Sequence, residues 1–169
     1  MNPMTEPLTV RVAGAADLPG IVEVYNQAVA VQATADLDPV TVAGRQGWFA
    51  AHDPQRYPIL IAERGGTLAG WVSLSPHRPG RRAVRRAAEV SYYVHRDHRR
   101  QGVATSLVNA ALERCPALGV DVVFAIVLAD NVASLALLER LGFARWGLLP
   151  EVADFDGRRV GHVYCGKRL

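Results

Sequence analysis

Residues 89–105 constrain the fold of this chain more than any other stretch, because they read as a strand, a short basic turn and the start of a helix. Residues 89–95 are rich in β-branched and aromatic side chains, and residues 101–114 carry apolar side chains at helical spacing. A turn between two such elements directs unpaired backbone N–H groups toward one point. Gly102 has no Cβ, so a ligand can approach the backbone there, and Ala104 keeps a nearby position small. The turn therefore predicts an anion site.

Positive charge in the same turn indicates which anion would fit. Three arginines lie beside the predicted donors: Arg96, Arg99 and Arg100. Several cationic side chains around backbone N–H groups favour a diphosphate over a single carboxylate. We therefore expect a ligand that carries a diphosphate.

The run from Arg99 to Ala104 resembles the (Gln/Arg)-x-x-Gly-x-(Gly/Ala) pyrophosphate loop of the GNAT superfamily of acyl-CoA-dependent N-acetyltransferases. Its setting agrees with this family, because Asn131 begins a helix after a later strand and Leu141-Gly142-Phe143 closes that helix. The resemblance implies acetyl-CoA as co-substrate. It also implies that two central strands splay apart around the pantetheine arm, with the gap between residues 92–94 and residues 124–127.

The resemblance also assigns contacts to the cofactor. Backbone N–H groups of the central strand would bind the thioester carbonyl, and the turn would bind the diphosphate. Asn131 would hydrogen-bond the pantetheine arm, and it also reads as a helix cap. The expected cofactor-binding residues are Tyr92, Tyr93, Val94, Arg99, Arg100, Gln101, Gly102, Val103, Ala104, Thr105 and Asn131. Tyr92 and Tyr93 point to opposite faces of a strand, so one of the two is expected in the core.

Acetyl transfer to an amine needs a base, because an alkyl amine with a pKa of ~10.4 is mostly protonated at neutral pH. Glu89 is the expected catalytic base, directly or through a water, since it matches the acidic residue of the phosphinothricin acetyltransferase branch. The alternative is a structural carboxylate paired with Arg85 or Arg86. Many superfamily members place a tyrosine or histidine seven residues after the capping asparagine as proton donor to the thiolate. Here that residue is Leu138, so either another group such as Tyr164 serves or the thiolate leaves unaided.

Four stretches extend the resemblance to the branch that acetylates phosphinothricin, methionine sulfone or methionine sulfoximine: residues 21–26, 33–36, 70–76 and 88–94. Arg85 matches an arginine that holds the substrate carboxylate in that branch, so Arg85 and Glu89 are the expected substrate-binding residues. Arg85 also reads as an exposed loop arginine. The branch usually has aromatic residues at the positions of His77, Arg78 and Val84. We therefore expect the acceptor pocket to have a more basic entrance and to take a different acceptor.

The expected function is an acetyl-CoA-dependent N-acetyltransferase that acts on a small amino-acid-like amine by direct attack in a ternary complex. A protein or peptide N-terminus, or an aminoglycoside, is the alternative acceptor. A second alternative is a non-catalytic acyl-CoA-binding regulatory module. The expected partner is thus a small-molecule amine, and a homodimer is expected from relatives.

The pattern along the chain predicts an α/β fold with helices on both faces of one sheet, and the resemblance adds that this sheet is mixed and mostly antiparallel. Strands are predicted at 8–13, 59–63, 68–75, 89–95, 122–128, 144–149 and 159–167, and helices at 17–29, 38–52, 101–116 and 131–141. The 169 residues fit a single domain, with residues 1–7 expected to be flexible.

The composition limits the partners. Half of the residues are apolar and 21% are charged, and no apolar run approaches the ~20 residues of a membrane span. Residues 1–7 lack the basic leader and apolar core of a secretion signal, so a cytoplasmic location is expected. The arginine-rich residues 78–86 read either as a site for an acidic ligand or as a solvated loop. Without interleaved aromatic residues they do not predict nucleic-acid binding.

Neither a metal site nor a disulfide is expected. Cys115 and Cys165 lie far apart in the sequence and form no Cys-x-x-Cys motif. His95 and His98 flank Asp97 across the turn, but the sequence offers no obvious third ligand for zinc. Buried free thiols are the better interpretation of the cysteines.

Overall fold

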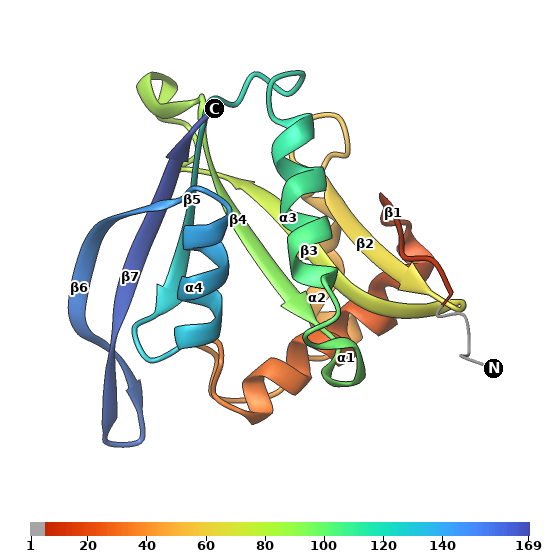
Figure 1. Cartoon of the computed structure of the whole chain (residues 1–169), viewed down its shortest axis with the longest axis horizontal. Helices are drawn as coiled ribbons and strands as arrows, with labels where there is room; N and C mark the ends of the chain where they lie inside the picture. Colours follow the sequence, from red (N-terminus) through yellow and green to blue (C-terminus); the bar gives the residue numbers. More distant parts are fainter. Residues whose placement is uncertain (1–5) are drawn as a thin grey trace.

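Strand β4 (Ala87–Val94) is the middle strand of a seven-stranded sheet in the computed structural model, which describes residues 6–169 (Figure 1). The strand order is β1-β2-β3-β4-β5-β7-β6. The other strands are β1 (Thr9–Val12), β2 (Ile59–Arg64), β3 (Thr67–Pro76), β5 (Val122–Leu128), β6 (Ala144–Phe155) and β7 (Arg158–Arg168). All neighbours pair antiparallel except β4 and β5, which are parallel. The expected mixed, mostly antiparallel sheet is confirmed.

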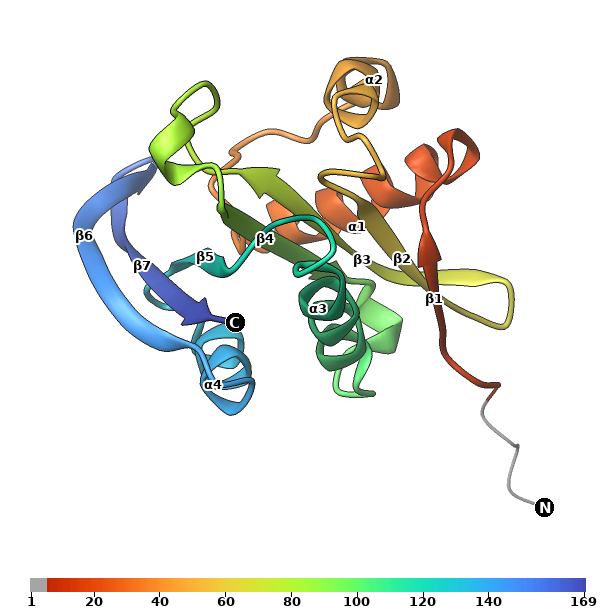
Figure 2. The same cartoon turned by 90° about the horizontal axis from the view of Figure 1, so that it is seen from above.

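Helices cover both faces of this sheet. They are α1 (Leu18–Ala30), α2 (Val42–Ala50), α3 (Val103–Arg114) and α4 (Val132–Arg140). Helices α1 and α2 lie on one face, and α3 and α4 lie on the other (Figure 2). Short 3₁₀ turns precede α1, β4 and α3, at Ala15–Asp17, Arg82–Val84 and Arg96–His98. The predicted α/β fold with helices on both faces is therefore confirmed.

Strand β4 sends alternate side chains to the two helical layers. Ala88 and Val90 are buried in the core that includes residues of α3. Tyr93 faces the other layer and packs on Trp71, with 4.8 Å between ring centroids. The indole N–H of Trp71 donates to the carbonyl of Ile21 at 3.0 Å, which fixes α1 on the sheet. Each position along β4 therefore has a defined side.

The parallel pairing between β4 and β5 stops early. It consists of three pairs, Ala87 with Val122, Ala88 with Val123 and Glu89 with Phe124. Beyond Glu89, β4 stays paired with β3 as far as Val94, while β5 stays paired with β7 as far as Leu128. The two strands therefore splay apart, and the predicted gap opens between residues 92–94 and the part of β5 that follows Phe124.

Helix α2 begins later than residue 38, where the sequence pattern placed its start. Thr41 is the N-cap, and its hydroxyl accepts a hydrogen bond from the N–H of Gly44 at 3.0 Å. The side chain of Asn26 in α1 bonds both backbone groups of Val40, at 2.9 Å and 2.8 Å. This long-range pairing holds Val40 outside the helix and outweighs the local start signal.

The last two strands are longer than predicted and form one hairpin. β6 continues past residue 149 through a register shift that ends at Ala153, and Pro150 falls within this shift. A proline is tolerated there because β6 is an edge strand and the missing N–H breaks no essential ladder bond. The turn is closed by the N–H of Gly157, which donates to the Asp154 carboxylate at 2.7 Å.

Of the two helices beside the gap, α4 has the predicted cap at Asn131, and α3 begins slightly later than predicted. Helix α3 starts at Val103 rather than residue 101, because Gly102 takes a left-handed conformation, with φ at 78°. Of the segment 1–7 that was expected to be flexible, residues 1–5 lie outside the described part of the chain.

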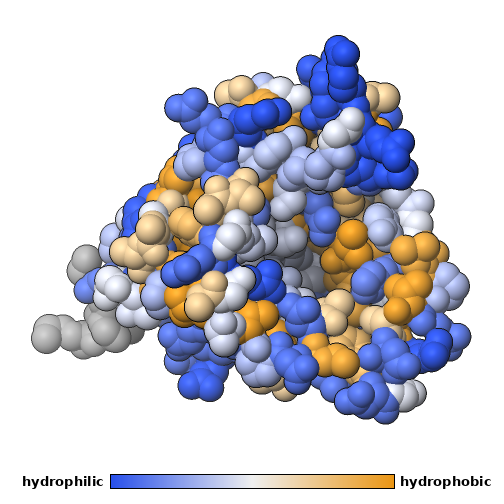
Figure 3. Space-filling view, turned by 180° about the vertical axis from the view of Figure 1, so that it is seen from behind, coloured by the Kyte–Doolittle hydropathy of each residue, from blue (hydrophilic) through white to orange (hydrophobic). Residues whose placement is uncertain are grey.

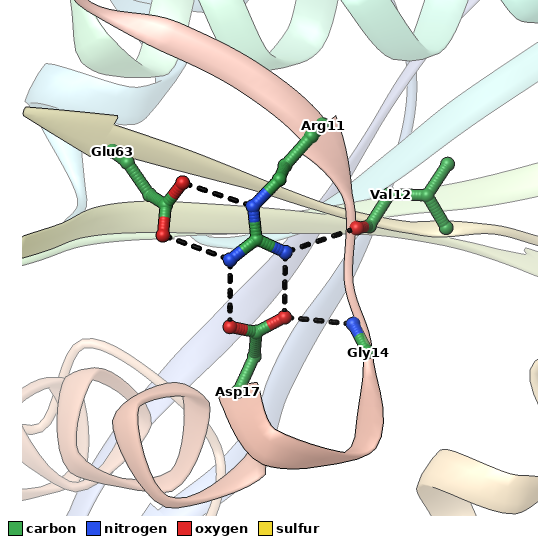
Figure 4. A network of polar contacts seen from close by, with 5 residues as sticks. All are labelled: Arg11, Val12, Gly14, Asp17 and Glu63. Atoms are coloured by element: carbon green, nitrogen blue, oxygen red, sulfur yellow. Dashed lines mark hydrogen bonds and ion pairs between the residues drawn. The ribbon is translucent and has the colours of Figure 1, made fainter. Parts of the chain in front are cut away.

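Arg11 on β1 ties together the edge of the sheet and the start of α1 (Figure 4). Its guanidinium donates to both oxygens of Glu63 on β2, at 2.9 Å and 2.8 Å. It also donates to both oxygens of Asp17, at 2.8 Å and 2.9 Å. The Asp17 carboxylate further accepts from the N–H of Gly14 at 2.7 Å. The Arg11 hydrogen bonds lower the pKa of Asp17, so this carboxylate stays ionised.

Replacing Arg11 with Met should lower the free energy of unfolding by about 1 kcal/mol near neutral pH, because partly exposed charge-assisted hydrogen bonds are lost while the aliphatic stem remains. Asp17 has its pKa lowered from the usual 3.8, so its contribution is complete above that value and is lost as the pH falls through the lower folded-state pKa. The deficit of the Arg11→Met protein, measured by urea unfolding, should therefore shrink at low pH.

The exposed Arg56 provides a matched control, since its side chain forms no hydrogen bond or ion pair with any described residue. Arg56→Met should leave stability nearly unchanged at both pH values. A deficit of Arg11→Met that stays constant down to about pH 2 would contradict the assigned role of Asp17.

Candidate active site

The gap between β4 and β5 opens into a cavity of about 850 Å³. Its walls come from β4 between Glu89 and Val94 and from β5 between Ala125 and Leu128. The turn before α3, residues of α4 and the segment from Ala28 to Ala35 at the end of α1 form much of the rest of the wall. The cavity therefore runs from the basic turn to the point where the two strands part.

The turn presents backbone donors that the protein does not use. Within residues 6–169, no N–H group from residue 99 to residue 105 donates to a protein acceptor, and the first bond of the following helix runs from Ser106 to the carbonyl of Gly102 at 3.0 Å. Arg100 and Gly102 both have positive φ, at 58° and 78°. Such a conformation turns successive N–H groups to the same side and makes an anion-binding concavity. The turn is also exposed, so a diphosphate can reach it.

Most residues predicted to bind the cofactor line this cavity. They are Tyr92, Tyr93, Val94, Arg99, Arg100, Gly102, Val103, Ala104, Thr105 and Asn131. Gln101 instead accepts from Arg64 and donates to the carbonyl of Asp97 at 3.0 Å, so it braces the turn against β2. Asn131 also caps α4, because its side-chain oxygen accepts from the N–H of Ser134 at 3.2 Å. The two roles expected for Asn131 are therefore compatible.

Two backbone N–H groups of β4 point into the gap. The N–H of His95 donates to the carbonyl of Ala69 in β3 at 2.9 Å. Because alternate N–H groups of a strand point to opposite edges, those of Tyr92 and Val94 point away from β3. Strand β5 does not pair with β4 beyond Glu89. These N–H groups are therefore placed to bind a carbonyl oxygen inside the cavity.

Glu89 lies on the cavity wall at the last pair of the parallel ladder. Its side chain is about half buried, and burial raises its pKa. The alternative partners are engaged elsewhere, since Arg86 donates to Asp121 at 2.7 Å and Arg85 donates to the carbonyl of Arg82 at 2.9 Å. Glu89 forms no ion pair with any residue that the structure describes. Its carboxylate is therefore available to accept a proton.

A second cavity, of about 190 Å³, lies on the face of the sheet that α1 and α2 cover. Figure 3 looks onto this side of the molecule and shows a hollow there. Four aromatic rings form much of the cavity wall: Tyr25, Trp48, Trp71 and Tyr93. Ser91 and Tyr93 line both cavities, so the two cavities meet at β4.

Arg45 brings a positive charge to the second cavity. Its guanidinium lies over the rings of Tyr25 and Trp48, at 4.8 Å and 5.6 Å from their centroids. It also pairs with Asp36 at 3.1 Å. Arg45 was not among the residues predicted from the sequence. The available signal was an arginine three residues before Trp48 on the amphipathic helix α2, where a cation can stack on an aromatic face.

Several other candidate residues lie apart from both cavities. Arg85 is exposed in the loop between β3 and β4 and lines neither cavity, so the structure does not bring it together with Glu89. Leu138 is fully buried in the core. Tyr164 stacks on Phe124, with 6.1 Å between ring centroids, and also lines neither cavity.

Among residues 6–169, no three His, Cys, Asp or Glu side chains are grouped so as to hold a metal ion. In His95, Nδ1 lies 3.7 Å from Oδ2 of Asp97, and Nε2 lies 3.6 Å from Oε1 of Glu23. Cys115 and Cys165 are buried free thiols, and burial raises the pKa of Cys115 to about 11. None of the described helices combines the length and apolar character required to span a membrane.

Comparison with known proteins agrees with this geometry. Residues 22–143 match the acetyltransferase (GNAT) family. The chain is 41% identical over 152 residues to the L-methionine sulfoximine/L-methionine sulfone acetyltransferase of Pseudomonas paraeruginosa. This match covers 89% of this chain and 88% of that protein. It is 30% identical over 152 residues to the phosphinothricin N-acetyltransferase of Streptomyces viridochromogenes, covering 88% of this chain and 81% of that protein.

A solved structure shows the same architecture. The GNAT superfamily phosphinothricin acetyltransferase from Sinorhizobium meliloti, in complex with acetyl-CoA, superposes with a TM-score of 0.89 at 30% identity. The superposition covers 96% of this chain and 88% of that one. The resemblance seen in the turn before α3 thus extends over nearly the whole chain, and the protein belongs to the GNAT family of acetyltransferases.

Proposed function

We propose that the protein transfers an acetyl group from acetyl-CoA to the amine of a small amino-acid-like substrate, of the phosphinothricin or methionine sulfone type, by direct attack in a ternary complex. The observation that carries this proposal is the meeting of two cavities at Ser91 and Tyr93, beside the unpaired carboxylate of Glu89. One cavity has the size and donors for the cofactor, and the other is small and aromatic. Relatives named for phosphinothricin and methionine sulfoximine support the acceptor class.

The residues of the larger cavity fit acetyl-CoA. The free N–H groups of the turn, with Arg99 and Arg100, would hold the diphosphate. Asn131 would hydrogen-bond the pantetheine arm, and the N–H groups of Tyr92 and Val94 would bind the thioester oxygen. When bound, acetyl-CoA supplies an acetyl group activated as a thioester. The protein has to align that group with the acceptor amine and to exclude water.

Glu89 would take the proton that the acceptor amine must lose. An alkyl amine has a pKa of ~10.4 and is mostly a cation at neutral pH, so a base is needed for attack. Burial raises the pKa of Glu89, which makes its carboxylate a stronger base than an exposed one. Glu89 lies on the same face of β4 as Ser91 and Tyr93, where the two cavities meet.

An amino-acid acceptor carries a carboxylate as well as an amine, and we propose that Arg45 binds it. Asp36 occupies one nitrogen of the guanidinium at 3.1 Å, and the others remain to donate to a ligand. The positive charge of Arg45 disfavours polycationic acceptors such as aminoglycosides. Arg85, the position that the resemblance points to, is the second candidate, for a carboxylate that extends toward the arginine-rich loop.

The homodimer expected from relatives and the cytoplasmic location expected from the N-terminal sequence both stay predictions. In support of the homodimer, β6 is an edge strand with four exposed apolar side chains: Trp146, Leu148, Leu149 and Val152. A second copy of the chain would cover them.

Gly102→Val should weaken the binding of CoA by at least about tenfold, because its side chain would enter the space in front of the free N–H groups. Gly119→Val is the matched control. Gly119 also has positive φ, at 74°, with open space around it, and it follows the far end of α3. Both variants should lose about 1–2 kcal/mol of stability from backbone strain, but only Gly102→Val should lose CoA binding in calorimetry. Normal CoA binding by Gly102→Val would count against the diphosphate site.

Glu89→Gln should lower kcat by about 100-fold or more, because a general base contributes that much, while CoA affinity stays the same. Burial raises the pKa of Glu89 above 4.5, so wild-type kcat/KM should fall as the pH drops through the raised pKa. This acid limb should disappear in Glu89→Gln. Glu113→Gln, at an exposed position of α3, is the control and should retain both rate and profile. Unchanged turnover of Glu89→Gln at neutral pH removes Glu89 from the mechanism.

Thiol release from acetyl-CoA should be fastest with acceptors that carry a carboxylate. The panel is methionine sulfone, phosphinothricin, the decarboxylated amine of methionine sulfone, and spermidine. Arg45→Gln should raise KM about tenfold or more for the two carboxylates and much less for the decarboxylated amine, since one charged hydrogen bond is lost. Arg85→Gln, assayed in parallel, tests the second candidate. Release of no thiol with any amine, together with thermal stabilisation by acetyl-CoA, would instead support a non-catalytic binding module.

A further inference from the structure

The sulfur that departs from the acetyl group needs a hydrogen-bond donor, and Leu138 cannot supply one. Leu138 stands at the position where the resemblance predicts a tyrosine or histidine. It has no polar atom, and it is fully buried in the core. If the protein is an acetyltransferase as proposed, the negative charge that develops on the sulfur has to be stabilised by a different side chain or by none.

Tyr92 carries a hydroxyl group without a partner. Its oxygen is buried and forms no hydrogen bond with any described residue. The side chain lines the larger cavity and packs against the core on the α3 and α4 side of the sheet. Burial raises the pKa of this hydroxyl, and Ser134 on α4 lies near enough to lower that pKa in part, but the two groups do not reach hydrogen-bond geometry. A buried unpaired hydroxyl is unfavourable, so its presence at a cavity wall points to an acceptor that a ligand supplies.

The position of Tyr92 relative to Glu89 suits a division of roles. Tyr92 is three residues beyond Glu89, about 10 Å along the strand, inside the region where β5 no longer pairs with β4. The two side chains lie on opposite faces of the sheet, because their positions in the strand differ by three, an odd number. Glu89 therefore faces the α1 and α2 side, where the acceptor cavity lies, and Tyr92 faces α4.

We propose that the Tyr92 hydroxyl donates a hydrogen bond to the departing CoA sulfur and stabilises its negative charge. This inference rests on the proposed function. As the amine nitrogen bonds to the acetyl carbon, Glu89 takes a proton from that nitrogen. The carbon–sulfur bond breaks, and its electron pair stays on the sulfur, next to the Tyr92 O–H. An acceptor that arrives as an ammonium ion first gives one further proton to solvent through Glu89. Glu89 returns each proton to solvent and the thiolate later takes up one, so an ammonium acceptor releases one proton overall.

Burial raises the pKa of Tyr92 to about 12. The phenol therefore remains protonated at neutral pH and always has a hydrogen to donate. A thiol of the cysteine type has a pKa of ~8.5, so full proton transfer from Tyr92 to the thiolate is unfavourable. Because the phenol of Tyr92 is a weaker acid than the thiol, it can donate a hydrogen bond to the thiolate without losing its proton.

Other groups near the gap are less well placed. Tyr164 stacks on Phe124 and lines neither cavity. His162 lines the larger cavity, but it pairs with Leu128, about 13 Å beyond the last pair of the β4–β5 ladder. His98 belongs to the turn before α3, at the diphosphate end. Tyr92 is therefore the donor that the geometry favours.

The test compares Tyr92→Phe with the wild-type protein. The substitution keeps the ring and removes only an unpaired hydroxyl, so the melting temperature should not fall. With methionine sulfone as acceptor, kcat should fall about 10- to 100-fold, while KM for acetyl-CoA changes little. Independently of turnover, the ultraviolet absorbance of the thiolate reports the pKa of the thiol in bound CoA. That pKa should be lower in the wild-type protein, with about a tenfold larger thiolate fraction at a given pH than in Tyr92→Phe.

Tyr164→Phe is the matched control and should leave kcat and the thiol pKa of bound CoA unchanged. If Tyr92→Phe keeps the wild-type thiol pKa, the inference is overturned whatever happens to kcat. If Tyr164→Phe raises the thiol pKa instead, the role belongs to Tyr164, and the assignment to Tyr92 is wrong. If the wild-type protein releases no thiol with any amine, the proposed function fails, yet the titration of bound CoA still decides whether Tyr92 contacts the sulfur.

Discussion

The cavity exists because the parallel ladder between β4 and β5 is only three pairs long. Both strands continue beyond it, and each keeps its other neighbour, β3 or β7, along its whole length. The gap is therefore supported on both sides by complete antiparallel pairing, and it does not depend on a flexible loop. Backbone N–H groups that a continuous sheet would use for pairing face a cavity instead. A sheet that is otherwise fully paired thus acquires donors for a ligand at its centre.

Strand alternation then separates the chemistry by face. Glu89, Ser91 and Tyr93 point toward the aromatic cavity under α1 and α2, where an acceptor would enter. Val90 and Tyr92 point toward the core under α3 and α4. A proton acceptor and a hydroxyl donor on opposite sides of the same opening can act on opposite sides of one thioester. In the proposed mechanism, the order of residues in this single strand would place the attacking amine and the departing sulfur on opposite faces of the sheet.

Local signals were sufficient to predict the strands and helices, their order along the chain and the turn before α3, whereas the mixed, mostly antiparallel pairing of the sheet was expected from the family resemblance. Gly102 and the strand-to-helix setting determine the turn conformation within a few residues, so sequence alone indicated free N–H groups there. The start of α2 could not be predicted, because the bonds from Asn26 to Val40 join residues of separate elements. Arg45 was missed for the same reason, since its contact with Tyr25 exists only once α1 and α2 pack together. The start of α2 and the place of Arg45 both depend on contacts between elements, and a pattern within one element does not reveal such contacts.

Buried polar atoms that form no hydrogen bond lower the stability of the fold at their positions. Among the described residues these side-chain atoms belong to Arg64, Tyr92 and His98. Tyr92 and His98 line the larger cavity, and Arg64 bonds Gln101, which braces the turn at the cavity's end. Each unpaired atom is unfavourable by about 1–3 kcal/mol in the absence of a ligand. Such atoms are rare in folded proteins, and where they cluster around one cavity they are explained by a polar ligand that completes their bonds. The unpaired atoms of Tyr92 and His98 therefore support the proposal that a polar cofactor occupies the larger cavity.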